Sequence, residues 1–180
     1  PAVSTFFGFR NEIQSVIYTV SFSFDTLSAL FLLPIYVIGI LAATHAVGYL
    51  EGHADGRNGW FWFFFNATLA AMTWVTVAVT PIEFLLAWEL MGMMSFALVA
   101  FEYHARETMR AAWVYLLACH AGAAFLILMF VYGGSDNVPP SFMAAVIVLG
   151  MAGFGLKIGF PVLHVWLPEA HPAAPAPVSA

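Results

Sequence analysis

Long apolar stretches alternate with short polar breaks along most of the chain. Five of these stretches have roughly the 20 residues that an α-helix needs to cross the hydrocarbon core of a membrane. They cover residues 26–48, 60–79, 82–101, 109–132 and 142–166. The breaks between them are short and rich in turn-forming or charged residues. The pattern therefore predicts an all-α integral membrane protein, in which five transmembrane helices form an antiparallel bundle.

The two ends of the chain differ from this pattern. Residues 1–21 are mixed in character, and we expect them to form an extramembrane segment, whereas residues 22–180 form the transmembrane domain. The sequence begins at Pro1 without a methionine and stops within the apolar sequence "PAPVSA". We therefore expect it to be a piece of a longer protein.

Arginine positions predict the orientation of the bundle. Arg57, Arg106 and Arg110 fall in the breaks after the first and third stretches, which lie on the same side of an antiparallel bundle, while Arg10 stands on the other side. Because short cytoplasmic loops collect Lys and Arg, the side with three arginines is predicted to be cytoplasmic.

Composition supports a multi-pass membrane protein. The chain is 62% hydrophobic and 8% charged, far from an ordinary soluble domain. Its net charge of -5 is spread over the loops, which predicts no nucleic-acid partner. It holds one cysteine, Cys119, which excludes a disulfide framework and any multi-cysteine metal or iron–sulfur site.

The fifth stretch contains a predicted helix break. Its segment "GMAGFGLKIGFP" has five glycines or prolines in twelve residues, among them Gly159 and Pro161. Pro161 has no backbone N–H, so the carbonyl of Lys157 loses its helical partner. Such a break is tolerated in a membrane only where the backbone faces protein or a water-filled cavity.

Three ionisable residues lie near the middle of predicted spans: Glu89, His120 and Lys157. A charged side chain there costs roughly 2.5 to 3.5 kcal/mol, so we expect all three to face the bundle interior. Desolvation favours the neutral form of a buried lysine, and a carboxylate about 4 Å away restores the charged form. A changing distance between Glu89 and Lys157 would thus let the lysine hold or release a proton. His120 could extend such a proton path.

Structural alternatives exist for each of these residues. Glu89 and Lys157 could form a static ion pair that only fixes helix packing, and His120 could be a hydrogen-bonded core residue. Asp25 is better explained as a helix cap or interfacial anchor than as a transport residue.

A metal site made of His164, Glu169 and His171 lacks a fourth ligand and a fixing helical spacing, so no metal is expected. We expect this segment to form a rigid turn. His164 would then lie close to the membrane boundary, where it could pass protons inward.

Four segments together resemble the antiporter-like membrane subunits of respiratory complex I, Mrp cation/proton antiporters and membrane-bound hydrogenases. They are "FDTLSALF" (24–31), "VGYLEG" (47–52), "WELMGMMSFAL" (88–98) and "KIGFPVLHVWLPEAHPAAPAPVSA" (157–180). The last looks closest to hydrogenase-4 and formate hydrogenlyase subunits. The resemblance implies that Glu89 is the acid of the conduction site, Lys157 the central proton carrier and His164 the histidine before W-L-P. No counterpart is assigned to His120.

The resemblance also implies a larger subunit of about fourteen helices with two inverted repeats. This chain would hold most of the first repeat. The implied function is proton translocation within a redox complex, as a non-catalytic subunit that binds no cofactor itself and contacts other membrane subunits and lipid. The implied location is the cytoplasmic (inner) membrane of a bacterium or archaeon. An Mrp-type antiporter subunit without a redox partner and a structural subunit remain the alternatives, and the ion is H⁺ or Na⁺.

Overall fold

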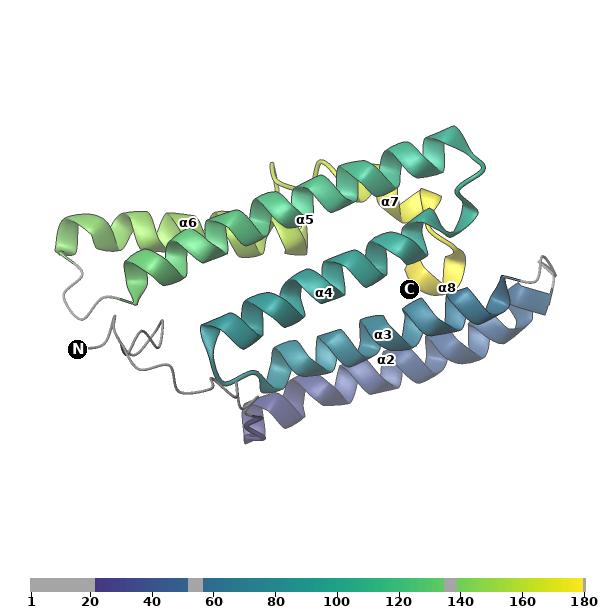
Figure 1. Ribbon diagram of the computed structural model, residues 1–180, viewed down its shortest axis with the longest axis horizontal. Coiled ribbons are helices and arrows are strands. Elements are labelled where there is room, and N and C mark those ends of the chain that lie inside the picture. The colour runs from purple at the N-terminus through teal and green to yellow at the C-terminus, as the bar shows by residue number, and fades with distance from the viewer. Residues whose placement is uncertain (1–21, 52–56, 135–138, 180) are drawn as a thin grey trace, which may run out of the picture.

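The computed structural model describes residues 22–51, 57–134 and 139–179, which form a bundle of long helices (Figure 1). The long helices are α2 (Thr26–Glu51), α3 (Asn58–Val77), α4 (Pro81–Val99), α5 (Arg106–Gly133) and α6 (Pro140–Ile158). Three short helices accompany them, namely η1 (Ala100–Glu102), α7 (Leu167–Ala173) and α8 (Ala176–Ser179). The described residues contain no strand beyond an isolated bridge between Phe22 and Ala78. The predicted segment 1–21 lies outside the described residues.

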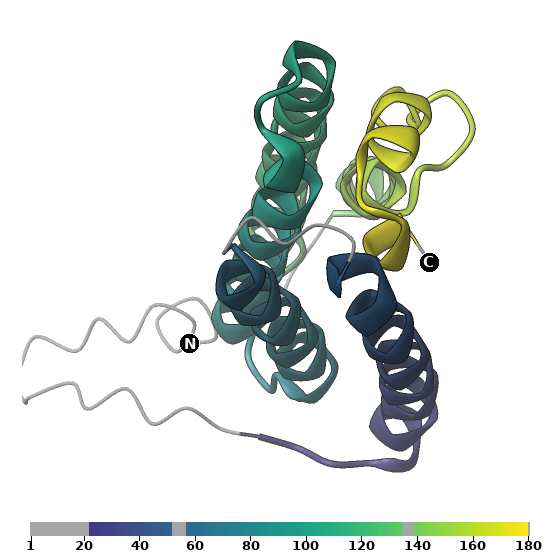
Figure 2. The same cartoon turned by 90° about the vertical axis from the view of Figure 1, so that its right-hand side faces the viewer.

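All five long helices are long and apolar enough to cross a membrane, which confirms the predicted all-α membrane architecture. The first four observed helices start and stop within three residues of the predicted stretches. Successive helices pack beside one another in the order α2, α3, α4, α5 and α6. The end-on view shows α8 lying near α2, where Val178 packs against the α2–α3 core (Figure 2).

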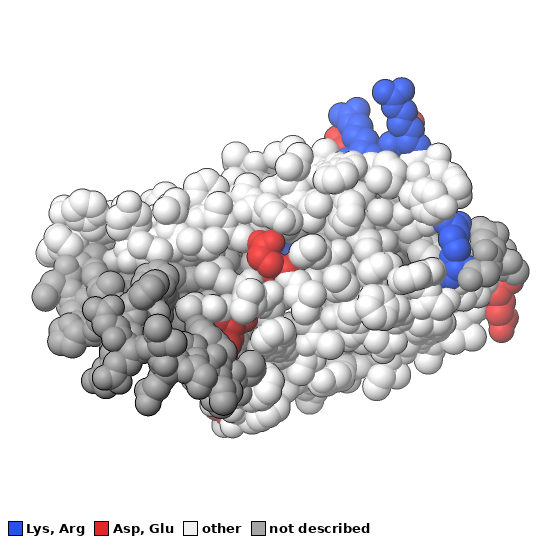
Figure 3. All heavy atoms as spheres, viewed as in Figure 1, with Lys and Arg blue, Asp and Glu red and all other residues white. Residues whose placement is uncertain are grey.

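The face of the bundle seen in Figure 3 carries few charged side chains. Large side chains such as Leu30, Trp60 and Leu117 are more than 60% exposed, as expected of groups that meet lipid rather than water. Small residues, including Ala42, Ala46 and Ala112, fill much of the buried core and allow the helices to approach closely. Arg57, Arg106 and Arg110 all lie at the start of α3 or α5, which places them at one end of the bundle.

Two helix starts are capped by side chains. Asp25 precedes α2 and accepts a hydrogen bond from the Ser28 N–H at 2.6 Å, which confirms its predicted capping role. The same bond from the Ser28 backbone lowers the pKa of Asp25 below its ordinary value. At α4, Thr80 and Glu83 form a capping box, in which the Glu83 carboxylate accepts from the Thr80 N–H at 3.0 Å.

Helices α5 and α6 meet through glycines. A Cβ atom built on Gly122 would lie 2.9 Å from the Gly153 carbonyl oxygen, and one built on Gly153 would lie 2.7 Å from the Leu126 side chain. Neither position leaves room for a larger residue. This close approach fixes the position of α6 along α5. It therefore also fixes which residues of α5 lie level with Lys157.

The fifth predicted stretch ends earlier than expected. Helix α6 stops at Ile158 rather than at residue 166, because Gly159 takes a left-handed conformation with φ 75°. The Gly155 carbonyl accepts the Phe160 N–H at 2.9 Å, a typical helix-ending bond. The chain then turns through residues 159–166 and resumes as α7.

One side chain stabilises this break. The Trp166 indole N–H donates to the Leu156 carbonyl at 2.6 Å, so a carbonyl at the frayed end of α6 has a partner. The Trp166 ring also packs edge-on against Tyr115, with the centroids 5.0 Å apart. Trp166 therefore ties the end of α6 to the turn that follows it and to α5.

The glycine contact between α5 and α6 gives a first prediction. Gly122→Ala should lower the free energy of unfolding of the full-length protein by about 1 to 3 kcal/mol, because its methyl group meets backbone that cannot yield locally. Thermal unfolding in detergent would measure this. Gly48→Ala is the matched control: nothing lies within 4 Å of its Cβ, so that variant should unfold at the same temperature or higher. Equal unfolding temperatures for Gly122→Ala and Gly48→Ala would contradict the close helix contact.

Candidate functional site

Lys157 lies in the last turn of α6, opposite the middle of α5. Its Nζ donates a hydrogen bond to the Cys119 Sγ at 3.3 Å. The same Nζ lies 5.6 Å from the ring centroid of Trp88 on α4 and 5.6 Å from that of Tyr115 on α5. The lysine thus reaches from α6 into the space between three helices, half-buried and surrounded by two aromatic faces and a thiol.

Gly92 makes the space for this ammonium group. A Cβ atom built on Gly92 would lie 3.1 Å from Lys157 Nζ and 3.5 Å from Cys119 Cβ. Gly92 follows Trp88 by one helical turn, so both residues lie on the same face of α4. The face of α4 that meets Lys157 therefore combines one large aromatic ring with one residue that has no side chain.

Glu89 pairs with His120. Glu89 Oε2 and His120 Nε2 are 3.4 Å apart, and His120 Nδ1 also lies 3.0 Å from the Leu116 carbonyl oxygen. The His120 side chain is 52% exposed and that of Glu89 is 32% exposed. The prediction that His120 faces the bundle interior is thus wrong for the described chain. Its neighbour Cys119 occupies the inward face of α5, and consecutive helical residues point about 100° apart.

Glu89 and Lys157 are neighbours without direct contact. Among residues 22–51, 57–134 and 139–179, they form no ion pair within 4.0 Å. Glu89 and Gly92 are three residues apart and so lie beside each other on the surface of α4. Lys157 Nζ fills the space beside Gly92, which places the carboxylate on the helix face adjoining the ammonium group. The site therefore consists of two linked pairs, Lys157 with Cys119 and Glu89 with His120.

His164 lies in the turn between α6 and α7, where it is exposed. Its backbone carbonyl accepts the Leu167 N–H at 2.9 Å, which helps to start α7. Glu169 lies 3.6 Å from Arg110 across the α5–α7 contact. Within the described parts of the chain, no three His, Cys, Asp or Glu side chains gather as a possible metal site.

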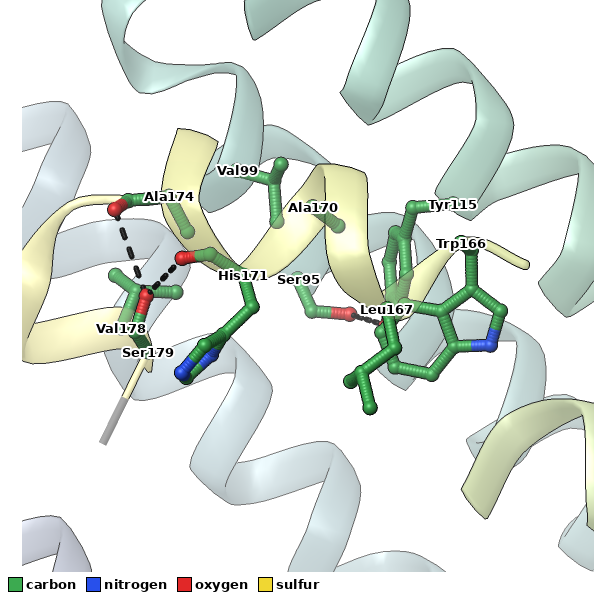
Figure 4. A pocket seen from close by; sticks show the side chains of 10 residues that line it. All are labelled: Ser95, Val99, Tyr115, Trp166, Leu167, Ala170, His171, Ala174, Val178 and Ser179. Atoms are coloured by element: carbon green, nitrogen blue, oxygen red, sulfur yellow. Dashed lines mark hydrogen bonds between the residues drawn. The ribbon is translucent and has the colours of Figure 1, made fainter. Parts of the chain in front are cut away.

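A cavity of about 260 Å³ lies beside Tyr115, at the end of the bundle where α7 and α8 pack (Figure 4). Its polar lining includes Ser95, Tyr115 and His171, and Figure 4 shows the Ser95 hydroxyl directed at Tyr115. The two hydroxyl oxygens are 2.6 Å apart. Figure 3 shows that basic side chains on the visible face gather mainly at the end of the bundle where α5 begins.

The sequence did not single out the direct neighbours of Lys157. Cys119 and Tyr115 resemble ordinary core residues, and Trp88 resembles packing material. The available signal was their spacing: Trp88 and Gly92, like Tyr115 and Cys119, are four residues apart and share a helix face.

Two family models match the chain. The model described as "NADH:quinone oxidoreductase/Mrp antiporter, TM" covers residues 78–180, which include Glu89, His120 and Lys157. The model described as "NADH-Ubiquinone oxidoreductase (complex I), chain 5 N-terminus" covers residues 11–61. The first spans more than half of the chain.

Curated relatives agree with these matches. "Hydrogenase-4 component B" of Escherichia coli (strain K12) is 29% identical over 87% of this chain and 25% of its own length. "F(420)H(2) dehydrogenase subunit N" of Methanosarcina mazei is 29% identical over 94% of this chain and 37% of its own. "Putative antiporter subunit mnhA2" of Staphylococcus aureus (strain MRSA252) is 28% identical over 93% of this chain and 23% of its own.

The chain thus spans between about a quarter and somewhat over a third of the length of these relatives. The match to the larger family model agrees with the five apolar helices that the structure contains. The chain is therefore an integral membrane protein that belongs to the NADH:quinone oxidoreductase/Mrp antiporter family of membrane subunits.

Proposed function

We propose that this chain belongs to a proton-translocating subunit of a multi-subunit redox complex, of the NADH:quinone oxidoreductase or membrane-bound hydrogenase type. The observation that supports this most strongly is the position of Lys157. It is the only lysine of the chain, and its ammonium group lies between three membrane-spanning helices, midway along α5. A charge at that depth is costly, and such residues in membrane proteins mark ion and proton paths.

Lys157 would act as the group that takes up and releases protons. Its four-carbon stem is flexible, and the end of α6 is held by glycine and the Trp166 bond rather than by continuous helix. The contacts of Nζ in this structure are with neutral groups, namely two rings and a thiol. A neutral surrounding favours proton release more than a carboxylate partner does.

Glu89 would set the proton affinity of Lys157. In this structure its carboxylate faces His120, and movement of the lysine toward Glu89 would exchange neutral neighbours for an anionic one. At an effective dielectric near 20, an attraction over 4 Å is about 4 kcal/mol, equal to roughly three orders of magnitude in proton affinity. Proton uptake would accompany the approach of the two groups, and proton release their separation.

His120 would extend the proton path from Glu89, and His164 would connect the pair to the adjacent half-channel. His120 contacts Glu89 directly and is half exposed on the described chain, so it could receive a proton when Glu89 changes partner. His164 is exposed beyond the helix break that Gly159 makes. These roles of His120 and His164 depend on the proposed proton exchange at Lys157.

The partners follow from the same proposal. Other membrane subunits and lipid would cover the exposed apolar faces, and flavin, nickel or iron–sulfur groups would reside in other subunits. The setting would be the inner membrane of a bacterium or archaeon. Relatives whose names describe subunits of a hydrogenase and of a dehydrogenase support a redox host. A relative named as a putative antiporter subunit supports the second candidate, an Mrp-type antiporter that moves H⁺ or Na⁺ without a redox partner.

Removal of the lysine charge tests the proposal. Lys157→Met in the full-length subunit, assembled in its complex and reconstituted in liposomes, should reduce coupled proton translocation at least about tenfold, because the remaining side chain carries no proton. Lys157→Arg should also fail, since arginine does not release its proton. The control is Met151→Leu, a change at an exposed position on the same helix. Undiminished coupled translocation by Lys157→Met, in a complex that assembles normally, would remove the proposed function.

Gly92 offers a second test that leaves every ionisable residue in place. Gly92→Ala puts a methyl group about 3.1 Å from Lys157 Nζ, which is tighter than an ordinary contact, so the flexible lysine must shift away from α4. We expect translocation to fall several-fold while helix stability stays equal or rises, because alanine favours a helix over glycine by about 1 kcal/mol. Translocation assays and thermal unfolding of the same preparation would separate the two effects. Gly48→Ala should leave translocation unchanged, with stability equal or higher. Wild-type translocation by Gly92→Ala would argue against a defined lysine position.

A further inference from the structure

A line of hydroxyl and thiol groups leads from Lys157 to the cavity beside α7. Lys157 Nζ donates to Cys119 Sγ at 3.3 Å. Tyr115 lies one turn before Cys119 on the same face of α5. Its ring centroid is 5.6 Å from Lys157 Nζ, and its hydroxyl lies 2.6 Å from the Ser95 hydroxyl. Ser95 and Tyr115 both line the cavity of about 260 Å³.

The inner part of this line is closed off by protein. Tyr115 is 7% exposed and Cys119 is 4% exposed, so both lie in the packed core between α4, α5 and the turn after α6. The cavity, in contrast, is large enough for several waters and is lined by His171, whose side chain is exposed on α7. The line therefore runs from the lysine through the packed core to a place that water can enter.

We propose that Ser95, Tyr115 and Cys119 form a relay through which protons pass between this cavity and Lys157. The inference rests on the proposed function, because it requires Lys157 to exchange protons. It adds a route that is separate from His164. The cavity lies at the arginine-bearing end of the bundle, since Arg110 and Glu169 meet beside it, so the relay would serve the side predicted to be cytoplasmic.

Each member of the relay can accept one proton while it gives up another. In the release direction, a Lys157 N–H proton moves to Cys119 Sγ as the thiol proton moves to the Tyr115 oxygen. In the same concerted shift, the phenolic proton moves to Ser95 Oγ and the Ser95 hydroxyl proton moves to a water in the cavity. Lysine ends neutral, the water carries one extra proton, and the three relay groups end uncharged. Uptake is the reverse.

The hydrogen bonds of Ser95 agree with this direction. Its hydroxyl lies 2.6 Å from the Met91 carbonyl, to which it donates. Because a serine hydroxyl has one proton, the 2.6 Å contact with Tyr115 then has Tyr115 as the donor. Ser95 is thus arranged to receive the phenolic proton, and rotation about its Cβ–Oγ bond would turn its own proton from Met91 toward the cavity.

Single-atom changes test the relay. Tyr115→Phe removes the hydroxyl and keeps the ring that lies against Lys157 and Trp166. Cys119→Ala breaks the line at its next member, whereas Cys119→Ser restores a group that accepts and donates. In the complete complex in liposomes, we expect Tyr115→Phe and Cys119→Ala to lower proton translocation roughly tenfold or more, and Cys119→Ser to retain most of it.

Tyr36→Phe is the matched control. It removes a hydroxyl that contacts Thr73 at 2.9 Å between α2 and α3, away from Lys157, and it should translocate like the wild type. Thermal unfolding of each variant identifies losses of translocation that are due to misfolding. The comparison of Cys119→Ser with Cys119→Ala tests the relay at Cys119 without any change at Tyr115.

The outcomes separate the relay from the function on which it rests. If Tyr115→Phe and Cys119→Ala translocate at the wild-type rate while Lys157→Met does not, the relay is wrong and the proposed function stands. If Lys157→Met also translocates at the wild-type rate, the proposed function fails and the relay fails with it. Losses in Tyr115→Phe and Cys119→Ala, with Cys119→Ser and Tyr36→Phe active, support the relay.

Discussion

The placement of one lysine ammonium at mid-depth in an apolar bundle is the constraint on which the rest of the site depends. The cost of that charge explains why Lys157 reaches between α4, α5 and α6 instead of facing lipid. Two aromatic faces and a thiol offset part of the cost through weak interactions with the cation. Weak neutral contacts of this kind hold a charge without fixing it, which suits the proton exchange proposed for Lys157.

The backbone geometry around the lysine follows from glycine and tryptophan. The Gly122–Gly153 contact sets the height of α6, and Gly159 ends that helix two residues after the lysine. Trp166 then provides a hydrogen bond to a carbonyl that the helix end leaves unpaired. A lysine at the end of a helix retains more freedom than one in mid-helix. The break thus serves two purposes, because it frees the lysine and brings α7 against α5 to form the cavity.

The sequence predicted the helices well and the contacts of the site poorly, for a physical reason. Hydropathy over 20 residues depends only on local composition, so five spans could be located, and proline and glycine marked the break. Which side chains meet depends on the rotation of each helix, where one residue corresponds to about 100°. A rotation of about 100° turns Trp88 toward Lys157 but not Glu89, and Cys119 but not His120. This rotation explains why the prediction that His120 faces the bundle interior was wrong.

The proposed function requires Lys157 to change its protonation state during turnover. Isotope-edited infrared or ¹⁵N NMR spectra of the full-length subunit in its complex can test this claim directly, with the Lys157 signal assigned by its loss in Lys157→Met. If Lys157 exchanges protons, its ammonium signal should weaken when the reaction that drives the complex is started and return when it is stopped. The ammonium protons should also exchange with deuterated water. A Lys157 ammonium signal that is identical at rest and in turnover would contradict the proposed proton exchange.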